Sequence, residues 1–190
     1  MLLVILVLWL LAALALGYSD ILAHAPLAAV PAVLWGLVAL QLISFRYGAG
    51  FRTRVLRLDI RWLVALHLSR FVGLELMRLG RAGLLPADFG QAGGVGDVVI
   101  AVLAFFLLLQ SARPVEKWKA LLVAWNLLGV LDMLFVVGTA ARYALLQHHP
   151  LPPLTVLPLS LLPTFLVPML IFSHVVIFVR LRASGKSALV

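Results

Sequence analysis

Runs of apolar residues long enough to cross a lipid bilayer alternate along this chain with short basic segments. The run from Leu2 to Gly17 contains no charged residue. Of all residues, 64% are hydrophobic and 12% are charged, whereas an average soluble domain has about 25% charged residues. This much apolar surface must face lipid. The sequence therefore predicts a polytopic membrane protein and excludes a soluble enzyme, a disordered tail and a nucleic-acid module.

A hydrocarbon core of about 30 Å needs about 20 helical residues. The alternating pattern of a membrane β-barrel is absent, so the spanning elements are expected to be helices. We expect an all-α transmembrane helical bundle of about six spans, forming a single transmembrane domain over residues 1–190. The expected spans are residues 2–17, 27–45, 61–78, 96–111, 118–140 and 156–180.

Basic residues are concentrated in alternate connections. Five Lys or Arg lie in segment 46–61, three in segment 112–119 and three in the tail after residue 179, whereas the other connections hold three. Cytoplasmic connections of membrane proteins carry an excess of Lys and Arg. The sequence therefore predicts that both termini are cytoplasmic.

The basic segment after the second span also contains apolar residues. Such a segment can lie in the inner headgroup layer and bind anionic lipid. The net charge of +8 is accordingly interpreted as topology and lipid contact, and we expect no nucleic-acid partner. The expected lipid-contacting residues are Arg52, Arg54, Arg57 and Arg61.

Two histidines have equal predicted depth. His67 and His174 each lie about 9 Å from the inner boundary at 1.5 Å per helical residue. Two neutral imidazoles on facing helices can ligate a b-type haem, with arginines near its propionates. The alternative is a pair of interior histidines that hydrogen-bond to a Ser hydroxyl, a carbonyl or water. Haem b is the one cofactor that the sequence suggests, and no metal site is predicted.

Ionisable residues within the spans define a second candidate site. Those of segment 61–78 form one polar stripe at helical spacing, which is expected to face the bundle interior. By depth, Arg70 is level with Asn126, and Glu75 with Asp132. The predicted buried network consists of Arg70, Glu75, Arg78, Asp97, Asn126 and Asp132.

The network has two interpretations. It is either a structural set of ion pairs or, through Glu75, Asp97 and Asp132, a proton or cation site. No catalytic residue is predicted, because no Ser shares a depth with a His and a carboxylate as a triad requires. Small residues, among them Gly36, Gly73, Gly129 and Gly138, permit close helix approach within the bundle or against a partner.

Residues of the predicted third and fourth helices match a family pattern. His67, Arg70, Glu75, Pro86, Asp97 and Ala104 together resemble a pattern in small, uncharacterised bacterial integral membrane proteins. The resemblance implies a bacterial inner membrane and a shared polar feature there. It implies no activity.

Three functions follow as hypotheses. The first is a non-catalytic integral membrane subunit or accessory protein within a larger membrane complex, respiratory or photosynthetic, with other membrane subunits and lipid as partners. The second is a haem-binding electron-transfer protein that uses His67 and His174. The third is a small proton-coupled transporter.

Overall fold

The computed structural model describes residues 2–112, 114, 117–146 and 151–186. All regular secondary structure in these residues is helical, which confirms the predicted all-α class. The helices group into two compact units. One contains the described parts of residues 1–54 and 137–169, and the other contains those of residues 55–136 and 170–190.

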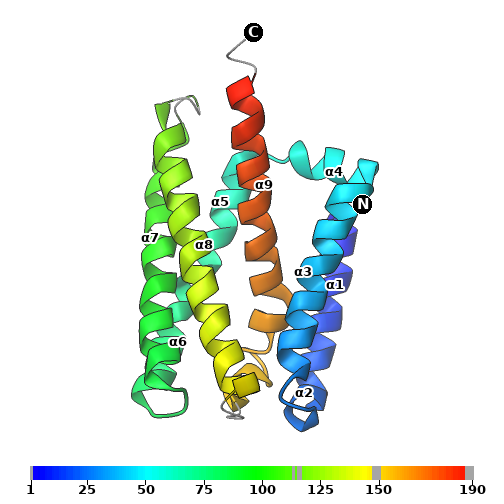
Figure 1. Ribbon diagram of the computed structural model, residues 1–190, viewed down its shortest axis with the longest axis vertical. Coiled ribbons are helices and arrows are strands. Elements are labelled where there is room, and N and C mark those ends of the chain that lie inside the picture. Colours follow the sequence, from blue (N-terminus) through cyan, green and yellow to red (C-terminus); the bar gives the residue numbers. More distant parts are fainter. Residues whose placement is uncertain (1, 113, 115–116, 147–150, 187–190) are drawn as a thin grey trace. The chain divides into compact units, whose positions relative to one another are not determined.

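Among the described residues, four helices are long and apolar enough to cross a membrane. They occupy Ala29–Tyr47, Asp88–Gln110, Lys117–Leu146 and Leu162–Ala183. The corresponding α-helices are α3 (Ala29–Tyr47), α7 (Gly94–Gln110), α8 (Lys119–Ala141) and α9 (Val167–Lys186) (Figure 1). Their length and composition are those of a multi-pass membrane protein.

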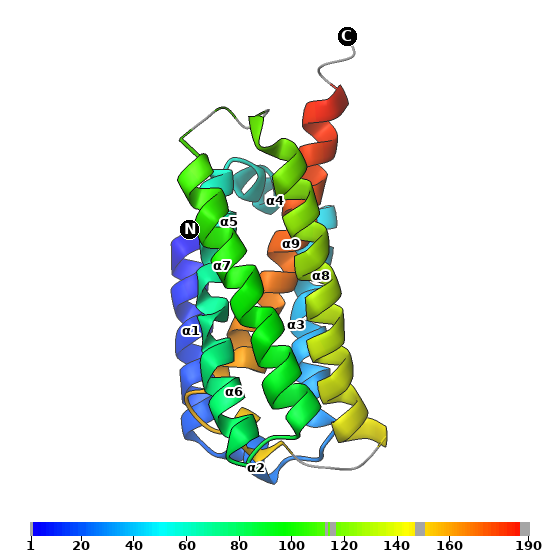
Figure 2. The same ribbon diagram turned by 90° about the vertical axis from the view of Figure 1, so that its left-hand side faces the viewer.

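The expectation of about six spans is wrong by these criteria. The first predicted span is α1 (Leu2–Tyr18), which has 17 residues and is shorter than the other four. The third is divided into α5 (Ile60–Leu66), a 3₁₀ turn η1 (His67–Val72) and α6 (Gly73–Arg81). The five charged side chains of Ile60–Arg81 keep this stretch out of the apolar set, although it lies alongside α7 (Figure 2).

The first unit holds α1, α3 and the π-helical turn η6 (Leu162–Leu166) together. The indole N–H of Trp9 donates to the carbonyl of Thr164 at 2.9 Å. A Cβ at Gly17 would lie 2.9 Å from a methyl carbon of Leu157. The absence of a side chain at this position therefore lets α1 approach the segment before η6. The short helices α2 (Ile21–His24) and α4 (Ala49–Leu56) also belong here, apart from the last residues of α4.

In the second unit, glycines bring α6 and α7 into backbone contact. A Cβ at Gly73 would overlap the carbonyl oxygen of Gly94, and a Cβ at Gly94 would overlap that of Gly73. Gly90, in the π-helical turn η2 (Asp88–Gly93), lies against Gly80 in the same way, because a Cβ at Gly90 would lie 2.7 Å from Cα of Gly80. Close approach of two helix backbones is the usual role of small residues in membrane bundles.

The basic segments meet at one end of the second unit. A guanidinium nitrogen of Arg61 donates to the carbonyl of Ser111 at 2.6 Å. Arg180 donates to the carbonyl of Leu58. These contacts bring the start of α5, the end of α7 and the end of α9 together. The clustering of basic connections on one side is therefore a feature of the fold.

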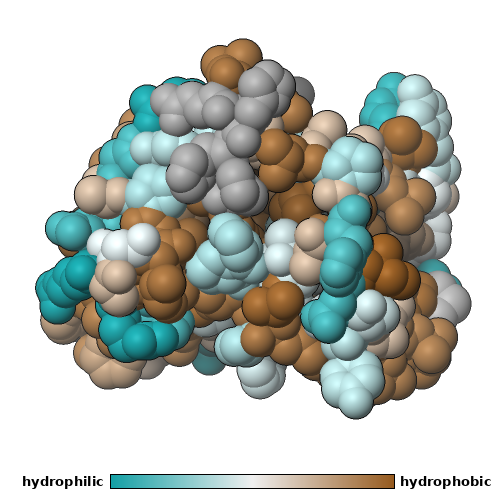
Figure 3. Space-filling view, turned by 90° about the horizontal axis from the view of Figure 1, so that it is seen from below, coloured by the Kyte–Doolittle hydropathy of each residue, from teal (hydrophilic) through white to brown (hydrophobic). Residues whose placement is uncertain are grey.

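Large apolar side chains remain exposed on the long helices. Examples are Val99 and Phe106 on α7, and Leu121, Leu128 and Leu131 on α8. Hydrophobic side chains also reach the surface beside hydrophilic ones in the space-filling view (Figure 3). Because contiguous apolar patches of this kind are rare on soluble monomers, these faces are suited to contact with lipid or with another membrane helix.

Candidate functional site: a buried ion triad and a histidine pair

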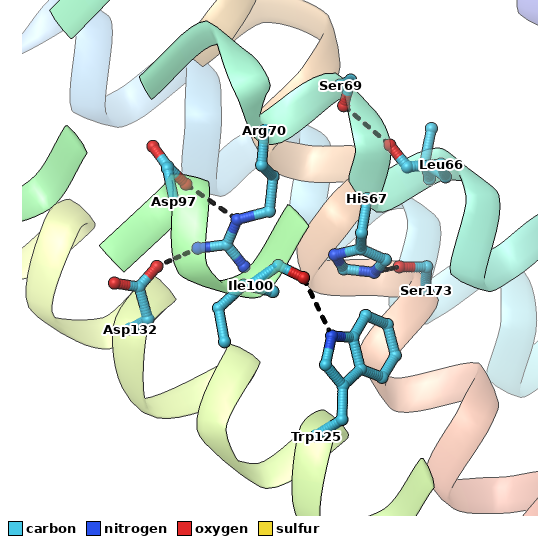
Figure 4. A network of polar contacts seen from close by, with 9 residues as sticks. All are labelled: Leu66, His67, Ser69, Arg70, Asp97, Ile100, Trp125, Asp132 and Ser173. Atoms are coloured by element: carbon cyan, nitrogen blue, oxygen red, sulfur yellow. Dashed lines mark hydrogen bonds and ion pairs between the residues drawn. The ribbon is translucent and has the colours of Figure 1, made fainter. Parts of the chain in front are cut away.

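Arg70 lies between two carboxylates in the interior of the second unit (Figure 4). Its Nε donates to Oδ1 of Asp97 at 2.7 Å, and its Nη2 donates to Oδ2 of Asp132. The exposed fraction of the side chain is 0% for Arg70, 8% for Asp97 and 14% for Asp132. We call these three residues the ion triad. It joins η1 to α7 and α8 through charge-assisted hydrogen bonds.

Two glycines make room for the carboxylates of the ion triad. A Cβ at Gly73 would lie 2.7 Å from the Cβ of Asp97, and a Cβ at Gly96 would lie 2.9 Å from Cγ of Asp132. Neither distance is possible for real atoms without movement of the backbone or of the acidic side chain. The two positions therefore allow both acids to reach one guanidinium.

His67 and His174 lie beside the ion triad and touch one another. Their ring centroids are 4.4 Å apart with the planes inclined by 49°, and Trp125 packs edge-on to His67 at 4.8 Å. The indole N–H of Trp125 donates to the carbonyl of Ile100 at 3.1 Å. All three aromatic side chains are buried. We call the two histidines the histidine pair.

The neighbours of each imidazole fix its tautomer in the neutral state. The hydroxyl of Ser173 donates to the carbonyl of Leu170, so it must accept the hydrogen bond of 2.9 Å that it shares with Nε2 of His67. His67 therefore carries its proton on Nε2, and its Nδ1 is an acceptor.

The tautomer of His174 follows from Asn126. The amide nitrogen of Asn126 donates to the backbone carbonyl of His174 at 3.2 Å, which leaves the amide oxygen facing Nδ1 of His174 at 2.7 Å. Because that oxygen can only accept, Nδ1 carries the proton and Nε2 is an acceptor. A Cβ at Gly129 would lie 2.8 Å from this Nε2, so the absence of a side chain at Gly129 makes room for the ring.

The histidine pair does not fit a haem. Two axial imidazoles must lie on opposite sides of a porphyrin plane, whereas these two rings are in direct contact. Nε2 of His67 and Nδ1 of His174 are also engaged by Ser173 and Asn126. The two histidines that the sequence singled out do lie together. Their arrangement is the alternative one, a pair of interior histidines that form hydrogen bonds to neighbouring side chains.

The predicted buried network is wrong at Glu75 and Arg78. They pair with each other at 2.6 Å on α6, and the exposed fractions of their side chains are 39% and 64%. The reason is η1, because a 3₁₀ helix advances about 120° per residue and an α-helix about 100°. Over the six residues of η1, the phase shifts by about 120°. This shift turns Glu75 and Arg78 away from the face that carries His67 and Arg70.

The depth pairings also change. Arg70 pairs with Asp132 instead of Asn126, while Asn126 holds His174. Sequence reasoning overlooked the roles of Trp125 and Gly96. No signal in the sequence singles out Gly96, because only the fold places it against Asp132.

The four predicted lipid-contacting arginines have different surroundings. The guanidinium carbon of Arg52 lies 5.6 Å from the ring centre of Phe45, a cation–π distance. Arg54 and Arg57 are exposed. One guanidinium nitrogen of Arg61 donates a hydrogen bond to the carbonyl of Ser111. In the part of the chain that the structure describes, no group of three or more His, Asp and Glu could hold a metal ion.

Fold and site together define a class of protein: an all-α protein with apolar helices long enough to cross a membrane and with a buried ion triad packed against a histidine pair. The chain belongs to a family described as a domain of unknown function (DUF8737), whose model matches residues 27–182. This match covers every residue of the ion triad and the histidine pair. No curated protein matches the chain, and no solved structure matches it.

Proposed function

We propose that this protein is a non-catalytic integral subunit or accessory protein of a larger complex in the bacterial inner membrane, respiratory or photosynthetic. One observation carries the proposal. The charged groups in the interior of the second unit are paired with one another, Arg70 with both Asp97 and Asp132. Such a network stabilises the packing of the helices and needs no bound substrate.

Outward-facing small residues support a helical partner. A Cβ at Gly36 on α3 or at Gly138 on α8 would meet no atom of the described residues within 4 Å. These glycines therefore serve no close approach within their own unit. In membranes, small residues on an exposed helix face let a second helix pack closely.

We further propose that the basic end of the second unit faces the cytoplasm, and that both termini lie on that side. The supporting observation is the meeting of three basic segments at this end, through the contacts Arg61–Ser111 and Arg180–Leu58. The exposed guanidinium groups of Arg54 and Arg57 are then available to anionic headgroups of the inner leaflet.

Extraction under native conditions tests whether the chain is bound to a second membrane protein. Membranes are dissolved into polymer-bounded lipid particles, and the particle that contains the tagged chain is sized and its protein content quantified. We expect a defined second protein at fixed stoichiometry. Gly36→Leu should release it, whereas Ile43→Leu, a change of shape at another exposed position of α3, should not. A wild-type chain that is always alone in its particle would contradict the proposal.

The chain contains no Cys, so single-cysteine labelling tests the orientation. Ala112 and Leu84 are both exposed, and they lie close to opposite ends of α7. An impermeant maleimide added to cells whose outer membrane is permeabilised should label Leu84→Cys and should label Ala112→Cys only after lysis. The opposite pattern would overturn the proposed orientation.

A proton-linked transporter is the second candidate, because the ion triad has two carboxylates for one guanidinium. Its net charge is −1 unless it binds a proton, and Asp132 keeps a side-chain exposure of 14%. In vesicles that contain a pH dye, proton flux under an imposed gradient should fall to the protein-free level in Asp132→Asn. The exposed Glu75→Gln serves as the control and should leave the flux unchanged. Equal flux in wild-type and protein-free vesicles would eliminate this candidate.

A further inference from the structure

Three buried nitrogen atoms at the junction of the ion triad and the histidine pair have no hydrogen-bond partner among the described residues. They are Nη1 of Arg70, Nδ1 of His67 and Nε2 of His174. The exposed fractions of the three residues are 1%, 0% and 1%. A buried polar atom without a partner is costly, above all in a membrane interior where solvent cannot replace it. These atoms therefore indicate a ligand.

The three atoms have a defined donor and acceptor pattern. Nη1 of Arg70 can only donate. Nδ1 of His67 and Nε2 of His174 can only accept, because Ser173 and Asn126 fix the protons on the other ring nitrogens. The complementary ligand donates two hydrogen bonds and accepts one.

The three side chains also share one neighbourhood. His67 and Arg70 are three residues apart on a 3₁₀ turn, where side chains at that spacing are eclipsed. Figure 4 shows both extending from the same side of η1. The two imidazole rings are in contact with each other.

We propose that Arg70, His67 and His174 form an internal binding site for one water molecule. Water donates its two hydrogens to the two imidazole nitrogens and accepts one hydrogen from Arg70. An anion would face two lone pairs and the neighbouring carboxylates of the ion triad, and a cation would face the guanidinium. A carbonyl group such as that of a quinone has no hydrogen to donate. Water is the smallest neutral molecule that fits all three atoms.

The bound water joins two networks that the side chains alone leave separate. Through it, the Asp97–Arg70–Asp132 triad connects to the Asn126–His174 and Ser173–His67 bonds. One hydrogen-bonded system then links η1, α7, α8 and α9. Because the facing nitrogen of each imidazole carries no proton and the guanidinium of Arg70 can only donate, the water joins the two networks as a structural bridge.

Solid-state NMR of the full chain in hydrated lipid bilayers tests this site. With ¹⁵N-labelled histidine, magnetisation is transferred from water to the rings, and His67→Phe and His174→Phe assign the signals. We expect water contact at both rings, with His67 protonated on Nε2 and His174 on Nδ1. Arg70→Met should abolish the contact at both rings. Ser69→Ala should leave it unchanged, because the hydroxyl of Ser69 bonds to the carbonyl of Leu66 outside the site.

Gly129→Ala is a second variant that keeps all charges. Its methyl group would lie 2.8 Å from Nε2 of His174, so water contact at this ring should be lost while the chain stays helical. Absence of water contact at both wild-type rings would overturn the proposal. The reversed tautomer at either ring would also overturn it, because one of the two acceptors would then be a donor.

Discussion

Removal of the guanidinium of Arg70 is the sharpest test of the ion triad. The side chain is fully buried, and its two acidic partners are nearly so. In Arg70→Met, an unbranched apolar chain replaces most of the volume, and two carboxylates lose the cation that pairs with both of them. The change therefore measures the charge pairing more than the packing.

The size of the effect follows from burial. Breaking a buried ion pair by removing one partner costs about 3–5 kcal/mol, because the remaining acid must either stay charged in the interior or take up a proton at neutral pH. Neutralising all three groups leaves no such charge. We therefore expect Arg70→Met/Asp97→Asn/Asp132→Asn to recover at least about 2 kcal/mol of the loss.

The loss of folding stability in Arg70→Met should also depend on pH. Without Arg70, the folded state keeps Asp97 and Asp132 buried by holding protons that the unfolded state releases at neutral pH. Stability rises with pH only where the unfolded state binds more protons. Here the folded state binds more, so the stability of Arg70→Met should fall as pH rises.

Reversible unfolding in mixed micelles, followed by tryptophan fluorescence, measures these free energies. The matched control is Arg78→Met, which breaks the exposed pair with Glu75 and should change stability little. The reasoning would be refuted if Arg70→Met were as stable as the wild type. It would also be refuted if the neutral triple variant were no more stable than the single one.

Two further predictions concern His174. Gly129→Ala should destabilise the fold by about 1–3 kcal/mol through overpacking against the imidazole, whereas Gly138→Ala, which adds a methyl group in open space, should be neutral in the same unfolding assay. Asn126→Leu should cost about 1–3 kcal/mol, because it leaves the buried Nδ1 of His174 without a partner, and its ¹⁵N spectrum should show loss of the fixed tautomer. A single tautomer retained in Asn126→Leu would show that another group orients the ring.

Much of the class of this protein is readable from its sequence. Apolar length predicts membrane helices because a bilayer core admits little else. Charge distribution predicts that the segments around Arg61, Ser111 and Arg180 share one side, and their contacts in the fold agree. The rarity of charge in apolar helices also singled out Arg70, Asp97 and Asp132, the three members of the ion triad.

Other features needed the tertiary structure. Depth along an assumed α-helix paired Arg70 with Asn126, but depth has an uncertainty of several residues and says nothing of rotation. The 3₁₀ turn at His67–Val72 changes that rotation. With this rotation, Arg70 pairs with Asp132 and Glu75 lies on the surface. The pattern of apolar and polar residues in the sequence does not predict this turn.

The sequence by itself thus determined a helical membrane protein, its basic side and the residues that had to be paired in its interior. The fold decided which partner each received, because pairing depends on helix phase and on how closely backbones approach. Gly96 and Gly129 illustrate this point, since each is an ordinary glycine in the sequence and makes room for a polar side chain in the fold. The contact between His67 and His174, which favours a water site over a haem, is likewise a consequence of packing alone.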